Sequence, residues 1–339
     1  MEKEEPKDKK KLFGDAASRV STEEMNLVFS EINRIFREIQ SPKFPNFELS
    51  KSLPEKNDHG DIDIILENIE NEDNYKFILN TLGDKIIKFV KNGNILHCLY
   101  RSAAISKDVH VDFITASKDN FSSTLMYHAY GDFSGILGVV ARKLKYNYAS
   151  NGFYKIYTDK KNANHYIKIS DSLCDGLVIL GYGHVSHSKY HDIKSNLNII
   201  EFISDSALFS SEFFKDTDLN HGDRKRMRAG RKSARFIRDG LINLNKIRIQ
   251  EDDDYYFKKE FPELYSNYLQ KVKEIEEYVP YKAKYGGSWI MEKFKLSPGP
   301  IIGKIQKSWS DQYGESVDSV EENELYIFTE NFIRSISNH

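Results

Sequence analysis

The chain has 339 residues and a mass of 39.4 kDa, which is enough for one large domain or two modest ones. Its composition, with 40% hydrophobic, 13% aromatic and 29% charged residues and only 8 prolines, excludes collagen-like, low-complexity and wholly disordered proteins. Two cysteines, Cys98 and Cys174, are too few for a disulfide framework or a four-thiolate zinc site. The formal net charge of -2 does not indicate a polyanionic partner, so only a local basic patch can do so.

The amino end of the chain is charged and poor in large apolar residues. Met1 to Lys11 lacks the apolar run of a secretory signal peptide, and no run in the sequence reaches the roughly 18 apolar residues of a membrane helix. Residues 1–20 are rich in Lys, Glu and Asp, so we expect a disordered charged tail there. These features predict an intracellular, most simply cytoplasmic, protein that is not secreted and has no membrane partner.

Helix and strand patterns alternate in the first third of the chain. Apolar residues at 3.6-residue spacing predict helices, and polar/apolar alternation or short apolar runs predict strands. In chain order these patterns predict a helix from Ser21 to about Pro42, a strand over 61–66, a helix over about 71–91, and strands over 95–100 and 110–114. This order is typical of an α+β domain with a mixed sheet rather than of a helical bundle.

The remainder of the chain becomes mostly helical. We expect a helix over 131–146, two short strands over 152–157 and 165–169, and then helices over 224–242, 254–278, 300–311 and 321–336. We therefore place domain boundaries so that the chain divides into a tail at 1–20, an α+β domain at 21–120, a subdomain at 121–195 and a helical region at 196–339.

Three aspartates form the most informative pattern. Residues i and i+2 of a strand point to the same face, so Asp61 and Asp63 present two carboxylates side by side. A third carboxylate, Asp112, lies between Val111 and Phe113 in another predicted strand. If the strands are adjacent, the three aspartates converge, and a divalent cation such as Mg²⁺ would let them stay ionised. The alternative is a chance Asp-Ile-Asp at an exposed strand edge.

These residues resemble the DNA polymerase beta superfamily of nucleotidyltransferases, and family X DNA polymerases in particular. Gly60-Asp61-Ile62-Asp63 is similar to the Gly-Asp-Ile-Asp of that family, Ser52 to the Ser of its Gly-Ser turn, and Asp112 to its third carboxylate. Lys51 stands where the family has the turn glycine, so Lys51 and Lys56 are candidates for direct contact with phosphate. The resemblance extends over roughly residues 25 to 190.

The resemblance implies a nucleotidyltransferase palm at 21–120 that uses Mg²⁺, or Mn²⁺ in its place, and NTP or dNTP. It implies that Asp61 and Asp63 bind both metal ions, that Asp112 binds the catalytic ion and helps to deprotonate the attacking hydroxyl, and that Ser52 holds the terminal phosphates. In the subdomain at 121–195, Tyr127 is the candidate nucleotide-contacting residue, within Tyr127-His128-Ala129-Tyr130, where the family has Tyr-Phe-Thr-Gly.

A basic segment over 221–238 predicts contact with nucleic acid. It holds eight Lys or Arg residues against one Asp, and one helical face would carry Arg224, Arg228, Arg231 and Arg235. The alternatives are a solvated helix face paired with the acidic run Glu251 to Asp254, or a localisation signal.

A second resemblance lies near the end of the chain. Pro298-Gly299-Pro300-Ile301-Ile302-Gly303-Lys304 is similar to an element of tRNA nucleotidyltransferases and bacterial poly(A) polymerases. A helix that begins at Pro300 would offer free N–H groups to a phosphate, with Lys304 adding charge. The alternative is a packed helix start with Gly303 at a helix crossing.

Together these patterns predict an enzyme that adds a nucleoside monophosphate to the 3′ hydroxyl of a DNA or RNA end, with family X-like primer extension slightly favoured. RNA 3′-end tailing is the alternative within the same chemistry. An alternative of another class is a non-catalytic protein that binds nucleic acid through the basic segment alone.

Overall fold

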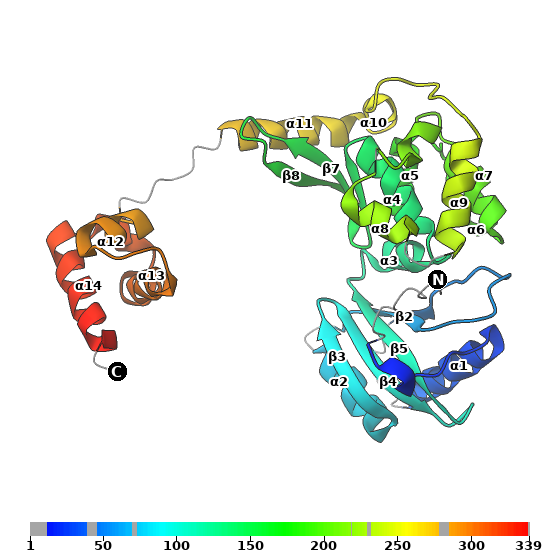
Figure 1. The fold of residues 1–339 in the computed structure, drawn as a ribbon, viewed down its shortest axis with the longest axis horizontal. Helices are drawn as coiled ribbons and strands as arrows, with labels where there is room; N and C mark the ends of the chain where they lie inside the picture. The colour runs from blue at the N-terminus through cyan, green and yellow to red at the C-terminus, as the bar shows by residue number, and fades with distance from the viewer. Residues whose placement is uncertain are drawn as a thin grey trace, which may run out of the picture. The chain divides into compact units, whose positions relative to one another are not determined.

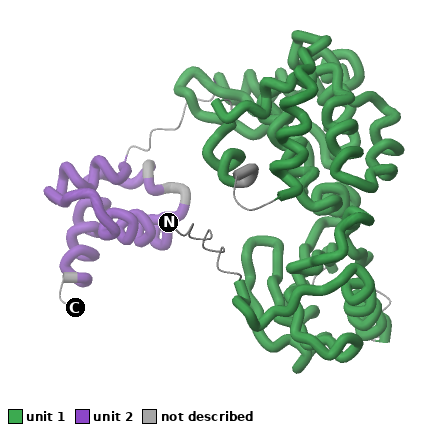
Figure 2. Tube along the Cα trace, turned by 45° about the vertical axis from the view of Figure 1, so that its right-hand side comes forward, with its two compact units in different colours: residues 1–276 green, residues 277–339 purple. Residues whose placement is uncertain are grey.

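The computed structural model describes residues 12–38, 46–69, 73–217, 219–228, 232–277 and 285–337. The chain divides into two compact units, residues 1–276 and residues 277–339 (Figure 2). The helices, the mixed sheet and the mostly helical remainder confirm the predicted α+β fold class. Among the described residues, no helix combines the length and the apolar character that crossing a bilayer requires.

A five-stranded mixed sheet forms the first part of unit 1 (Figure 1). Its strand order is β1-β2-β5-β4-β3, and β2 and β5 are parallel while the other neighbours are antiparallel. The strands are β1 (Phe47–Leu49), β2 (Ile62–Glu67), β3 (Ile86–Asn92), β4 (Ile95–Ser102) and β5 (Lys107–Ala116).

Two helices cover one face of this sheet: α1 (Thr22–Glu38) and α2 (Asn74–Leu82). Val28, Ile32 and Phe36 of α1 pack against the alternate residues Ile62 and Ile64 of β2, which the two-residue period of a strand turns toward them. The polar residues between these apolar ones therefore face away from the helices. This arrangement places Asp63 and Asp112 on the face of the sheet opposite α1 and α2.

The helix predicted over about 71–91 is wrong in its second half. Helix α2 ends at Leu82, the following Gly83 has a φ of 52°, and residues 86–92 form strand β3. A two-residue turn at Gly93 and Asn94 then joins β3 to β4 as a hairpin. The β-branched residues of β3 also fit a helical spacing, but pairing with β4 makes this segment a strand.

Part of the predicted amino-terminal tail is folded. Residues 1–11 lie outside the described part of the chain, but Phe13 is buried, and Ser18 and Val20 form β-bridges with Val109 and His59. The backbone N–H of Ser18 donates to the carbonyl oxygen of Asp108 at 2.8 Å. Two isolated bridges thus attach this segment to β5 and to the loop before β2, which the charged composition did not indicate.

The rest of unit 1 consists of a second sheet and surrounding helices. The antiparallel strands β6 (Tyr146–Ala149), β7 (Gly152–Thr158) and β8 (Asn164–Ser170) form the sheet. The helices are α3 (Phe121–His128), α4 (Phe133–Lys143), α5 (Leu173–Ile179), α6 (Ser186–His191), α7 (Asn196–Ser204), α8 (His221–Arg228), α9 (Lys232–Asn243), α10 (Tyr255–Glu260) and α11 (Pro262–Glu277).

The expected boundary near residue 195 differs from the observed division of the chain. One hydrophobic cluster contains Leu137 and Phe153 from one side of that position and Phe202, Ile237 and Phe257 from the other. Because these side chains share a core, the compact units separate between Glu276 and Glu277 instead. The helix expected over 254–278 is divided into α10 and α11, and a proline begins the second.

Unit 2 is a small helical domain with its own core. It contains α12 (Gly287–Phe294), α13 (Pro300–Tyr313) and α14 (Glu322–Ser337). Ile290, Ile305, Trp309 and Leu325 are buried together, and Trp309 Nε1 donates to Thr329 Oγ1 at 2.8 Å.

The start of α13 agrees with the predicted helix start at Pro300. A Cβ added at Gly303 would meet no heavy atom within 4 Å, so this glycine does not serve a close helix crossing. Lys304 is exposed on the same helix.

Glu31 is a buried carboxylate that joins α1 to the loop after β4. Its oxygens accept hydrogen bonds from Lys85 Nζ at 2.8 Å and Ser102 Oγ at 2.6 Å, and also from the backbone N–H groups of Ala103 and Ala104. Burial raises the pKa of Glu31, but these hydrogen bonds outweigh it and hold the pKa at about 2.

We predict that Glu31→Ala lowers the free energy of unfolding by about 2–4 kcal/mol at pH 7, because the ammonium and hydroxyl groups lose their buried partner. A carboxylate whose folded pKa is depressed stabilises the fold above its unfolded pKa near 4.5, and this contribution is lost as the pH falls toward 2. Chemical denaturation at several pH values measures both effects.

The matched control is Glu38→Ala on the same helix. Glu38 pairs with Arg34 at an exposed position, so its loss should cost less than about 0.5 kcal/mol. Equal losses for the two variants would contradict the role given to Glu31.

Candidate active site

The parallel pairing of β2 and β5 brings the three predicted aspartates together. Asp63 of β2 is the direct register partner of Asp112 of β5. Asp61 lies immediately before β2, two residues from Asp63. One carboxylate oxygen from each of the three lies within 4.8 Å of the others. Strands β2 and β5 are therefore adjacent, as the convergence of the three aspartates requires.

The concentration of carboxylates changes the acidity of Asp63. Its burial, followed by the charges of Asp61 and Asp112, raises its pKa from 3.8 to about 8. Ionising all three carboxylates at this distance costs electrostatic free energy unless a cation lies between them. The donor set, three carboxylate oxygens, is the kind that hard divalent ions such as Mg²⁺ prefer, so these residues fit the cation that the resemblance implies.

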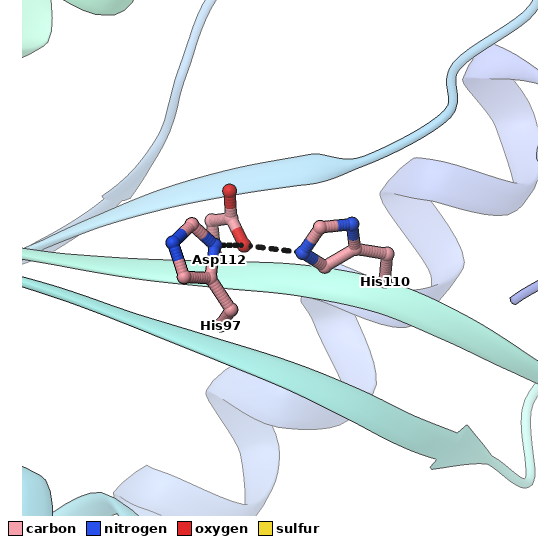
Figure 3. Close-up of side chains that lie close together, drawn as sticks. All are labelled: His97, His110 and Asp112. Carbon is pink, nitrogen blue, oxygen red and sulfur yellow. Dashed lines mark hydrogen bonds and ion pairs between the residues drawn. The ribbon is translucent and has the colours of Figure 1, made fainter. Parts of the chain in front are cut away.

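Two histidines contact Asp112 from the same face of the sheet (Figure 3). His97 Nδ1 of β4 and His110 Nε2 of β5 each lie 2.7 Å from the same oxygen, Asp112 Oδ1. Burial lowers the pKa of His110, but contact with Asp112 and the charges of Asp61 and Asp63 raise it by more, so the net shift is upward.

The segment before β2 is held against the aspartates by backbone hydrogen bonds. Ser50 N donates to the carbonyl oxygen of Asp63 at 2.9 Å, and Ser50 Oγ donates to that of His128 at 2.8 Å. Tyr130 N, in a residue with a φ of 59°, donates to the carbonyl oxygen of Lys51 at 2.8 Å. The predicted turn is thus fixed between β2 and the end of α3.

A cavity of about 140 Å³ lies beside this segment. Its lining includes five of the residues predicted for metal and nucleotide binding: Lys51, Ser52, Lys56, Asp61 and Asp63. Lys51 Nζ also lies 3.2 Å from His191 Nδ1. His128 lines the same cavity, and burial lowers its pKa to about 4, so this imidazole is neutral at pH 7.

Tyr127 is placed differently from the other nucleotide-binding candidates. Its ring stacks on Tyr148 with 5.9 Å between ring centroids and packs against the hydrophobic core of unit 1. Tyr127 is not among the residues that line the cavity of the aspartates.

The basic segment contributes to two described helices. Arg224 lies on α8, which is described up to Arg228, and Arg235 lies on α9, which is described from Lys232. Residues 229–231, and therefore Arg231, lie outside the described part of the chain, as does the side chain of Arg228.

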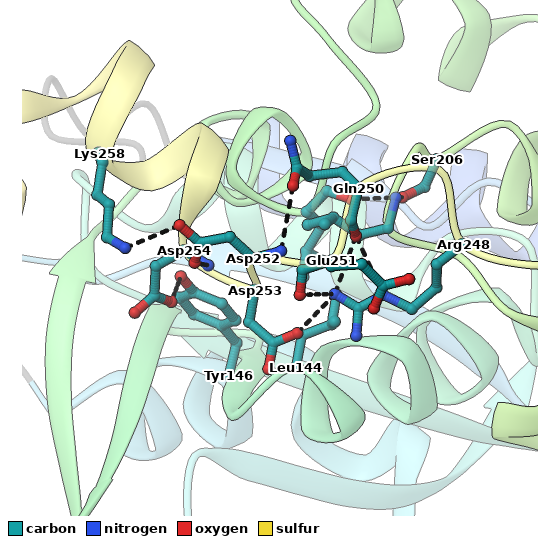
Figure 4. Close-up of polar contacts among 12 residues, drawn as sticks. Leu144, Tyr146, Ser206, Arg248, Gln250, Glu251, Asp252, Asp253, Asp254 and Lys258 are labelled. Carbon is teal, nitrogen blue, oxygen red and sulfur yellow. Dashed lines mark hydrogen bonds and ion pairs between the residues drawn. The ribbon is translucent and has the colours of Figure 1, made fainter.

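The acidic run at 251–254 pairs with other cations within the described residues (Figure 4). Asp252 pairs with Lys258, Asp253 with Arg248, and Asp254 with Lys155. The alternative that this run neutralises the basic segment is therefore not observed there. Within the described part of the basic segment, Arg224, Lys225, Lys232 and Arg235 form no ion pair.

A larger groove joins α9 to the aspartates. The groove has a volume of about 1150 Å³, and Lys232 and Ser233 line it together with Asp61 and Asp63. Phe13, Arg19 and His110 also line it.

Sequence reasoning missed several residues of this site. His110 lies two residues before Asp112, so the two-residue period of a strand could have placed it on the same face. His97 faces Asp112 only because of the register between β4 and β5, which the sequence does not specify.

Comparisons with known proteins found matches among solved structures only. No protein-family model matches the sequence, and no curated protein matches it. Solved structures with a similar fold include the ternary gap complex and the ternary P/T complex of polymerase beta from Leishmania infantum. The two matches have 14% sequence identity and TM-scores of 0.38 and 0.37. Each covers 44% of this chain, and they cover 55% and 62% of the polymerase chains, so this chain spans less than two thirds of their length.

We predict that Asp63→Asn raises the thermal midpoint without divalent ions, and more so at pH 8 than at pH 5. A carboxyl whose folded pKa is raised costs stability as the pH rises from its unfolded value near 3.8 through about 8, and Asn removes that cost. The expected increase at pH 8 exceeds about 3 °C, the shift that about 1 kcal/mol produces in a domain of this size. Addition of Mg²⁺ should stabilise the unmodified chain more than the variant.

Asp108→Asn is the control for this prediction. Asp108 also lies on β5, but it pairs with Arg101 away from the other carboxylates, so its variant should show no such pH-dependent gain. An equal rise in the thermal midpoint of both variants would contradict a destabilising effect that is specific to the Asp63 carboxylate.

Proposed function

We propose that this chain is a divalent-cation-dependent nucleotidyltransferase that joins a nucleoside monophosphate from NTP or dNTP to the 3′ hydroxyl of a nucleic acid. The observation that carries the proposal is the meeting of Asp61, Asp63 and Asp112 beside a cavity lined by Ser52 and two lysines. This combination offers carboxylates for cations on one side and hydroxyl and ammonium donors for phosphates on the other.

The reaction assigns a task to each group. The acceptor hydroxyl oxygen forms a bond to the α-phosphorus, the bond from that phosphorus to the bridging oxygen breaks, and pyrophosphate leaves. Asp61, Asp63 and Asp112 would hold Mg²⁺, which lowers the pKa of a bound hydroxyl and neutralises developing phosphate charge. Asp112 accepts the proton of the acceptor hydroxyl, and Ser52 Oγ and the Lys51 and Lys56 ammonium groups bind the terminal phosphates.

The groove lined by Lys232 and Ser233 is where we place the acceptor. Among the described side chains of α8 and α9, Arg224, Lys225, Lys232 and Arg235 form no ion pair and provide charge for a phosphate backbone. Primer extension and RNA tailing share this chemistry, and a polymerase-like reaction on DNA is our first choice. RNA 3′ ends are the second candidate, because the element from Pro298 to Lys304 is similar to one in tRNA nucleotidyltransferases and bacterial poly(A) polymerases, and Lys304 is exposed at the start of α13.

Incorporation of labelled nucleotides tests the proposal. The full chain is incubated with each NTP and dNTP, with Mg²⁺ or Mn²⁺, on single-stranded DNA, gapped duplex DNA and a tRNA-like RNA. We expect extension of at least one acceptor with release of pyrophosphate, and a loss of at least about 1,000-fold in Asp61→Ala/Asp63→Ala. The extended acceptor distinguishes primer extension from RNA tailing.

The matched control is Asp205→Ala/Asp108→Ala, which removes two carboxylates that pair with Lys189 and Arg101 and lie outside both the three-aspartate cluster and the groove lining. No incorporation on any acceptor, together with equal nucleic-acid binding by the chain and the Asp61→Ala/Asp63→Ala variant, would contradict the proposal. That result would instead support a non-catalytic nucleic-acid-binding protein.

Charge removal on α9 gives a separate prediction for the acceptor. Lys232→Ala/Arg235→Ala should weaken binding of the extended acceptor about tenfold at low salt and reduce the slope of log affinity against log salt by about 1–2. Fluorescence anisotropy at several salt concentrations measures both. Lys161→Ala/Lys271→Ala removes the same charge from positions that do not line the groove, and an equal loss there would refute a specific acceptor path.

A further inference from the structure

Two histidines and Asp112 form a compact group beside the three-aspartate cluster. His97 lies on β4 directly opposite Asp112 of β5, and His110 lies two residues before Asp112 on the same strand face. One nitrogen of each ring and one oxygen of Asp112 lie within 4.8 Å of one another. All three side chains are largely buried, with exposed fractions of 17%, 16% and 11%.

The two histidines contact Asp112 in different ways. His97 Nδ1 makes a hydrogen bond of 2.7 Å with Asp112 Oδ1. His110 Nε2 lies at the same distance from the same oxygen, yet this buried nitrogen does not have hydrogen-bond geometry with it. The His110 nitrogen is therefore held close to the carboxylate as an ion pair but lacks the well-directed hydrogen bond that a buried polar atom normally has.

We propose that His97, His110 and Asp112 form a binding site for a divalent transition-metal ion of the Zn²⁺ or Co²⁺ type, next to the Mg²⁺ site and sharing Asp112 with it. Two imidazole nitrogens and one carboxylate oxygen are a common donor set for such ions. Mg²⁺ prefers oxygen ligands and so would favour the three-aspartate cluster.

The surroundings of the group suit an ion of this kind. His110 lines the same groove of about 1150 Å³ as Asp61 and Asp63, so ions and water can reach it from that side. Phe13 packs edge-on against the His110 ring with 4.9 Å between ring centroids, which limits the orientations of the imidazole. An ion coordinated by His110 Nε2 would give this nitrogen a directed partner, which its contact with Asp112 does not provide.

The test measures metal binding and does not depend on the proposed nucleotidyl transfer. Asp61→Asn/Asp63→Asn replaces two carboxylates of the Mg²⁺ site by neutral amides, which bind cations weakly, and keeps the two histidines and Asp112. Co²⁺ is titrated into this full-length variant, and binding is followed by calorimetry and by visible absorption, which reports nitrogen ligation. We expect one Co²⁺ per chain, displaced by Zn²⁺.

A further variant separates metal ligation from hydrogen bonding. His97→Asn and His110→Gln, added to the same background, keep an N–H donor near the position of each ring nitrogen but are poor transition-metal ligands. We expect the nitrogen-dependent absorption to disappear and the Co²⁺ affinity to fall at least about 100-fold. His97→Asn alone is the alternative if the combined variant does not retain the circular dichroism and thermal midpoint of its parent.

Two results would overturn the inference. One is the absence of stoichiometric Co²⁺ binding in Asp61→Asn/Asp63→Asn, and the other is the same Co²⁺ affinity with and without the histidines. Either result would mean that the imidazoles only hold Asp112 by hydrogen bonds. Nucleotide incorporation by the unmodified chain is unaffected by this outcome, so failure here and failure of the proposed function are distinguishable.

Discussion

The repulsion among three carboxylates on one sheet face is the constraint on which the site depends. Parallel pairing of β2 with β5 places Asp63 opposite Asp112, and Asp61 lies two residues away. The apolar neighbours of these residues are buried under α1 and α2, so the strands cannot shift to separate the charges without losing core contacts. The fold thus maintains an arrangement that a divalent cation would stabilise.

Segments from distant parts of the sequence complete the surroundings of the aspartates. The turn at 50–53 is fixed by hydrogen bonds to β2 and to residues 128–130, and residues 12–20 pair beside β5. Lys232 and Ser233 approach from α9, which belongs to the same hydrophobic core as the second sheet. Because these contacts are made by backbone and buried groups, they fix the position of the backbone around the cavity.

The sequence predicted those parts of the site that local periodicity determines. The two-residue period of a strand was sufficient for Asp61 and Asp63, and the apolar neighbours of Asp112 identified its strand. The apolar residues of β3 also fit a helical spacing, so the sequence predicts a helix there. Pairing with β4 makes the segment a strand instead. The position of His97 opposite Asp112 depends on the register between two strands, which leaves no pattern in the sequence. The folded part of residues 12–20 is held by a single buried Phe13, which leaves no pattern either.

A crystal structure of the full chain with Mn²⁺ and a non-hydrolysable NTP tests the central claim most directly. The account predicts anomalous density for Mn²⁺ in contact with Asp61 and Asp63, and phosphate density that faces Ser52 and the lysines of the neighbouring cavity. Nucleotide bound elsewhere, or no metal density among the three aspartates at saturating Mn²⁺, would contradict it.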